Sequence, residues 1–174
     1  GAVPASHDVV VAATGRRAPA VTSDGFLTEL ARPAGDWRSR EIATSIRQRI
    51  ERVAISGARG TAPTVLARSG ETLRLESPVA DQVDRDLAER LLSDLSSLRM
   101  ETFLDSPLAP EVEKALAEPA GTVELTIAGE SAPLRIEVGG ATSSGKRVWR
   151  AGDQVFESTS VLAEVVTRPA AEWR

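Results

Sequence analysis

The stretch Gly140–Arg147, with the sequence GATSSGKR, comes closest to a motif that carries chemistry. It matches the phosphate-binding pattern G-x-x-x-x-G-K through Lys146, but Arg147 stands where the pattern has the Ser or Thr that binds magnesium. A phosphate-binding loop also opens a helix whose N-terminal amides hold the phosphates, whereas residues 148–156 have the pattern of a strand hairpin. We therefore predict a turn that binds no nucleotide.

Few other residues are of types that support catalysis or metal binding. The sequence has no Cys, no Tyr and a single histidine, His7, with no second metal ligand beside it. This composition excludes disulfides, thiolate metal sites and cysteine nucleophiles. The acidic residues mostly fall on predicted solvent faces, although two carboxylates from different elements could meet in a cleft for acid–base work. We expect no catalytic residue, cofactor or metal site, and a carboxylate-based hydrolase is the remaining enzymatic alternative.

The composition is that of a folded protein without a nucleic-acid-binding face. The 174 residues are 41% hydrophobic and 26% charged. The arginines are scattered among 25 acidic residues, and the net charge of −4 argues against nucleic acid as a partner. No apolar run approaches the roughly 20 residues of a membrane-spanning helix, so we expect no direct membrane insertion by this segment. Because the chain starts at Gly1 and its one methionine is Met100, we expect it to be part of a longer protein.

The hydrophobic periodicity predicts one long helix over residues 77–99, opened by Ser77-Pro78, and shorter helices at 111–117 and 158–166. The apolar positions of the long helix recur every three or four residues: Val83, Leu87, Leu91, Leu95 and Leu98.

Alternating apolar residues predict strands in most of the remaining sequence. One hairpin turns at Ser69-Gly70, which sets Leu66 opposite Leu73, and another turns at Gly152-Asp153. The second hairpin pairs Trp149 with Phe156, either as a core contact or as a stacking platform for a ligand. We therefore predict an α+β fold in which antiparallel hairpins form a sheet covered by the long amphipathic helix.

An internal repeat links the two ends of the chain. Residues 32–38 read RPAGDWR and residues 168–174 read RPAAEWR, which is five identities in seven positions. The preceding residues predict strand, turn, strand and helix in both places. We interpret residues 1–37 as the closing strand–strand–helix of one repeat unit and residues 38–174 as a complete unit.

The repeat makes Trp37 and Trp173 equivalent positions, each following a helix stopped by a proline, after which the chain should leave extended. We expect the larger burial at Trp37, which still has a unit after it. The residues singled out as interaction or structural anchors are Trp37, Arg38, Arg40, Trp149 and Trp173.

The segment from Trp37 onward resembles a bacterial domain-of-unknown-function family, number forty-three forty. The stretches that carry the resemblance are Trp37–Ile42, Ile50–Ile55, Leu73–Pro78 followed by Ala80-Asp81 and the leucine helix, and Leu116–Val123. Members of this family are typically envelope proteins encoded beside the permease and auxiliary subunit of gliding-motility-type ABC transporters. The family supplies no catalytic residues.

The resemblance implies a non-catalytic interaction module in an accessory protein of such a transporter. Its expected partner is a membrane or envelope protein, the transporter auxiliary subunit. Its expected location is the extracytoplasmic side of the cell envelope, where a further N-terminal segment tethers it. The alternative is a module that binds a glycan or small molecule in a cleft between tandem units.

Overall fold

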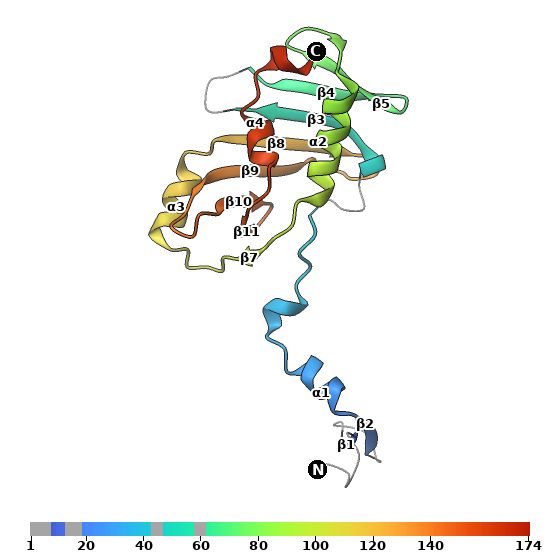
Figure 1. The fold of residues 1–174 in the computed structure, drawn as a ribbon, viewed down its shortest axis with the longest axis vertical. Coiled ribbons are helices and arrows are strands. Elements are labelled where there is room, and N and C mark those ends of the chain that lie inside the picture. Colours follow the sequence, from blue (N-terminus) through green and yellow to red (C-terminus); the bar gives the residue numbers. More distant parts are fainter. Residues whose placement is uncertain (1–7, 13–18, 43–46, 58–61) are drawn as a thin grey trace. The chain divides into compact units, whose positions relative to one another are not determined.

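The computed structural model describes residues 8–12, 19–42, 47–57 and 62–174. The chain divides into two compact units, Gly1–Ser39 and Arg40–Arg174, which are described separately. Their elements are drawn in Figure 1.

The first unit is a hairpin followed by two short helices. Strand β1 (Asp8–Val11) pairs antiparallel with β2 (Ala20–Ser23), and helix α1 (Asp24–Leu30) follows directly. The helix ends before Pro33, because proline disfavours helical conformation in the residue that precedes it. The chain then forms the 3-10 helix η1 (Ala34–Trp37) instead of leaving in the extended form that was predicted.

The second unit is built on an antiparallel sheet with the strand order β6-β5-β4-β3-β8-β9-β10-β11-β7 in its described residues. The strands at the two edges, β6 and β7, have two residues each, so few backbone groups are left unpaired there. The nine strands are β3 (Ile50–Ser56), β4 (Thr64–Ser69), β5 (Thr72–Ser77), β6 (Asp81–Gln82), β7 (Thr102–Phe103), β8 (Gly121–Ile127), β9 (Leu134–Ala141), β10 (Arg147–Ala151) and β11 (Gln154–Ser158).

Short helices lie on both faces of this sheet. Helices α2 (Arg85–Ser97) and α4 (Leu162–Val166) pack against one face, together with the 3-10 helix η3 (Ala170–Trp173). Helix α3 (Pro110–Ala117) contacts β9 and β10 from the opposite face, and the 3-10 helix η2 (Arg47–Arg49) leads into β3. In Figure 1, α2 and α4 cross the strands and α3 lies at the side of β9 and β10.

The predicted α+β fold with one long covering helix is wrong: the chain is mostly β-sheet. Ser77 belongs to β5, and the helix begins only after Asp84, whose side chain accepts a hydrogen bond of 3.0 Å from the amide of Leu87. At 1.5 Å per residue, the 13 residues of α2 extend about 20 Å. Nine strands spaced by about 4.8 Å extend nearly twice as far, so this helix reaches only part of the sheet.

The turn of the first hairpin lies one residue later than predicted. Leu66 is opposite Leu75, and Ser69 is opposite Thr72, so the turn residues are Gly70 and Glu71. Gly70 has a φ of +65°, a conformation that glycine adopts without the steric cost other residues meet. In the second hairpin the predicted turn at Gly152-Asp153 is confirmed.

The main hydrophobic core lies between the sheet and helices α2 and α4. Leu91 and Leu95 of α2 are fully buried in it, as the helical stripe predicts. Trp149 and Phe156 face each other across β10 and β11, as predicted, and their rings stack with centroids 6.4 Å apart. Their chain neighbours Val148 and Val155 point to the other face and form a smaller core beneath α3.

Candidate functional site

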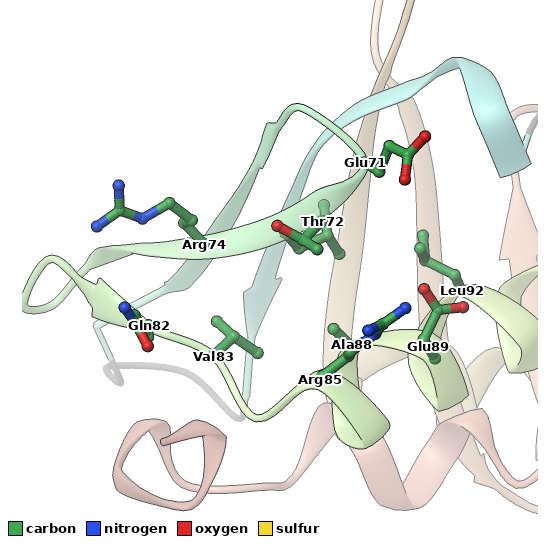
Figure 2. A pocket seen from close by; sticks show the side chains of 10 residues that line it. Glu71, Thr72, Arg74, Gln82, Val83, Arg85, Ala88, Glu89 and Leu92 are labelled. Carbon is green, nitrogen blue, oxygen red and sulfur yellow. The ribbon is translucent and has the colours of Figure 1, made fainter.

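One face of helix α2 turns four side chains toward strand β5. Arg85, Ala88, Glu89 and Leu92 are spaced by three or four residues, so they lie on the same side of the helix. Between this face and the β5–β6 edge of the sheet lies a cleft of about 350 Å³, drawn in Figure 2. We call it the β5–α2 cleft. Its remaining lining residues are Glu71, Thr72, Leu73, Arg74, Gln82 and Val83.

The β5–α2 cleft has an apolar floor and a charged rim. Leu73, Ala88 and Leu92 are buried and belong to the main core. Figure 2 shows Arg85 and Glu89 side by side on the helix and Glu71 at the end of the opposing strand. A cleft of this size, with an apolar base and a few polar groups, has the general features of a ligand site.

The charges on the rim are unequally paired. Glu89 forms an ion pair with Arg47 of η2. Arg74 and Arg85 are exposed, and within the described part of the chain no hydrogen bond or ion pair holds either of them. Figure 2 shows the side chain of Arg74 directed away from helix α2, on the other side of β5 from Arg85. The guanidinium group available to an anion bound in the cleft is therefore that of Arg85, and arginine binds anions through two parallel hydrogen bonds. The chemistry that this arrangement favours is binding.

The sequence did not single out this cleft. Glu89 was among the acidic residues expected on a solvent face, and it is half-buried. The signal present in the sequence was the spacing of Arg85, Ala88, Glu89 and Leu92 on one helical face. The sequence did not indicate that β5 lies opposite this helical face. The pairing of β5 with β6 brings the chain back to α2, and it involves only two residues of β6.

The five predicted anchor residues have different surroundings and do not form one site. Trp149 is a core residue, and its indole nitrogen donates a hydrogen bond of 3.2 Å to the carbonyl of Ser158. Arg40 donates one of 2.7 Å to the carbonyl of Glu101 and lies over the ring of Phe103. Arg38 is half-buried in the first unit.

The two remaining anchors contradict the burial order that was predicted for them. Trp173 is buried in the main core, whereas Trp37 is exposed. Trp173 is held because α4 and η3 fold back over α2 and the sheet, and the carbonyl of Trp173 accepts a hydrogen bond of 3.0 Å from the amide of Asp84.

The Gly140–Arg147 stretch contains the predicted turn: residues 142–146 connect the end of β9 to the start of β10. A strand therefore follows Lys146 where a phosphate-binding loop would open a helix. The loop is held by two carboxylates of the second unit. Glu157 accepts hydrogen bonds from Thr142 (2.5 Å) and Ser144 (2.9 Å), and Lys146 lies 3.1 Å from Glu101.

Glu101 is the most strongly perturbed carboxylate of this loop network. It accepts hydrogen bonds from the hydroxyl of Thr159 (2.6 Å) and from the backbone amide of the same residue (2.7 Å). These bonds, with a smaller contribution from Lys146, lower the pKa of Glu101 to about 2. The side chain is thus ionised at neutral pH and ties the end of β11 to the segment before β7.

Comparisons with known proteins give no identification: no family model, no curated protein and no solved structure matches the chain. His7 lies outside the described residues. Within residues 8–12, 19–42, 47–57 and 62–174, no group of three or more acidic, histidine or cysteine side chains gathers as a metal site. Over the same ranges, every helix is too short or too polar to cross a membrane.

Proposed function

We propose that the chain is a non-catalytic interaction module, the envelope-exposed part of an accessory protein of a gliding-type ABC transport system. The observation that supports binding is the β5–α2 cleft, where an apolar floor lies beside Arg85, an arginine that is unpaired among the described residues. The transporter context and the extracytoplasmic location are supported by the family resemblance of residues 37–123 alone.

The cleft fits a segment of a partner protein that carries an apolar side chain next to a carboxylate. The apolar side chain covers Leu73 and Leu92, and each square ångström removed from water contributes about 25 cal/mol. The carboxylate lies beside Arg85. Glu89 opposes it little, because Arg47 already neutralises that side chain. The transporter auxiliary subunit is the partner that we propose for this segment.

Site-specific photocrosslinking tests this proposal. A photoreactive residue replaces Gln82 on the rim of the cleft, and the full chain is produced together with the transporter. We expect a crosslink to the auxiliary subunit that weakens at least fivefold when Arg85→Ala is added. The control is the same photoreactive residue at Asp153, which is exposed in the β10–β11 turn. Equal crosslinking at both positions, or no effect of Arg85→Ala, contradicts the proposal.

The size of the cleft and the hydrogen-bonding side chains of Thr72 and Gln82 also favour the alternative of a glycan or small-molecule ligand. A saturable rise of the melting temperature with neutral or acidic oligosaccharides, abolished by Arg85→Ala, would support this alternative. The same series without any shift, alongside a positive crosslink at Gln82, would support a protein partner.

A further inference from the structure

Segments at the two ends of the described chain follow the same backbone path. The first unit runs β1, β2, α1, η1, and the second unit ends β10, β11, α4, η3. At an offset of 136 residues, η1 (Ala34–Trp37) coincides with η3 (Ala170–Trp173). The prolines before them agree as well: Pro33 has φ −53° and ψ 145°, and Pro169 has φ −61° and ψ 145°.

The residues that cap the two helices also share one conformation. Ala31 has φ −80° and ψ −4°, and its equivalent Thr167 has φ −91° and ψ −3°. A helix that ends in this way and is followed by an extended proline and one 3-10 turn fixes where the tryptophan lies relative to the helix. The shared sequence R-P-A-x-(D/E)-W-R therefore specifies a shared local structure.

Equivalent apolar side chains of the two segments differ in burial. In the second unit, Leu162, Val166 and Trp173 are at most 2% exposed. Their equivalents in the first unit, Phe26, Leu30 and Trp37, are 47%, 58% and 60% exposed. Large apolar side chains gathered on one short segment indicate a surface that another molecule or domain covers.

The second unit shows what such a segment packs against. Helix α4 contacts α2 and β8. A side chain at Gly121 of β8 would lie within 2.1 Å of Val166, so this glycine makes room for the helix. Trp173 is buried in the same core and bonds to Asp84 at the start of α2. We call the surface that α4 and η3 cover the seat. It is formed by elements of residues 40–146.

We propose that residues 8–38 form a closing lobe that docks onto the sheet of a second copy of this fold. In that complex Phe26, Leu30 and Trp37 occupy the positions that Leu162, Val166 and Trp173 occupy in the second unit. The partner is a sheet equivalent to residues 40–146, because that is the surface that the matching segment covers. This inference is independent of the β5–α2 cleft, since no residue of the cleft belongs to the lobe.

The chain offers a direct test, because residues 40–146 contain no tryptophan. A duplicate of residues 40–146 is placed before Gly1 of the full chain, and tryptophan fluorescence is quenched with acrylamide. In the natural chain, Trp37 is the exposed one of three tryptophans, so about a third of the emission is readily quenched. We expect the added copy to protect Trp37 and to abolish at least two thirds of that fraction.

Two further variants complete the test. Phe26→Leu with Leu30→Val gives the lobe the side chains that already fit the seat, so a tight fit at Gly121 no longer opposes docking. Phe26→Asp with Leu30→Asp is the control that prevents docking and keeps Trp37 quenchable. The proposal is overturned if Trp37 stays quenchable with both the natural lobe and the Leu/Val lobe. This holds whether or not the added copy folds, because a lobe that docks as proposed would complete the fold of that copy.

Discussion

The side chain of Glu101 joins three segments through charged hydrogen bonds, and its titration should be visible in the stability of the protein. Its pKa in the folded state is about 2, below the ordinary value of 4.5. A lowered folded-state pKa means that the stabilisation is fully present above about pH 4.5 and is lost as the pH falls toward 2. We predict that Glu101→Gln lowers the free energy of unfolding by about 1 kcal/mol at pH 7, because hydrogen bonds to a charged acceptor are the stronger ones.

Urea denaturation between pH 7 and pH 2 measures this effect. The difference between the natural chain and Glu101→Gln should shrink as the pH falls through that window. Glu51→Gln is the matched control, since Glu51 is exposed. A difference that stays constant down to pH 2 would show that the charge of Glu101 is not what stabilises the loop.

At the scale of elements, the packing of α3 on the sheet depends on the absence of a side chain at Gly139. A Cβ atom there would lie 2.7 Å from the carbonyl oxygen of Ala115 and 3.1 Å from that of Val148. Both atoms belong to the backbone, so the helix would have to move. We predict that Gly139→Ala costs about 1–3 kcal/mol in the free energy of unfolding.

The neighbouring glycine provides the control for this measurement. A Cβ atom at Gly140 would lie 3.6 Å from the side chain of Ala115, an ordinary contact. Gly140→Ala should therefore be neutral or stabilise by up to about 1 kcal/mol, because alanine restricts the unfolded chain. Equal losses in the two variants would contradict the close approach of α3 to β9.

The periodicity of apolar residues predicted the elements that depend on residues close together in the sequence. The stripe of Leu91 and Leu95, the turn at Gly152 and the pairing of Trp149 with Phe156 follow from spacing along the chain. The start of α2 could not be predicted in this way. Residues 77–82 fit a helical pattern, but Ser77 belongs to β5, and Asp81 and Gln82 pair with β5 as strand β6. The cleft was missed for the same reason: its two walls, β5 and α2, are brought together by that pairing.

At the scale of the whole molecule, the described residues form a two-stranded sheet in the first unit and a nine-stranded sheet in the second. Residues 147–174 complete the sheet to which they are joined. Residues 8–38 have the same order of elements, with their large apolar side chains exposed. The prediction that Trp37 is the more buried tryptophan was wrong because it placed the covering surface after the tryptophan. In the second unit the covering surface is the sheet that precedes it.

Acrylamide quenching of the natural chain and of Trp37→Phe tests this central contrast between Trp37 and Trp173 most directly. We predict that Trp37→Phe removes the readily quenched component and shifts the remaining emission to shorter wavelength, since Trp149 and Trp173 are buried. The melting temperature should change by less than about 2 °C, as is usual for a substitution of an exposed side chain. Quenching that persists unchanged in Trp37→Phe would show that one of the other two tryptophans is exposed, and would contradict the account.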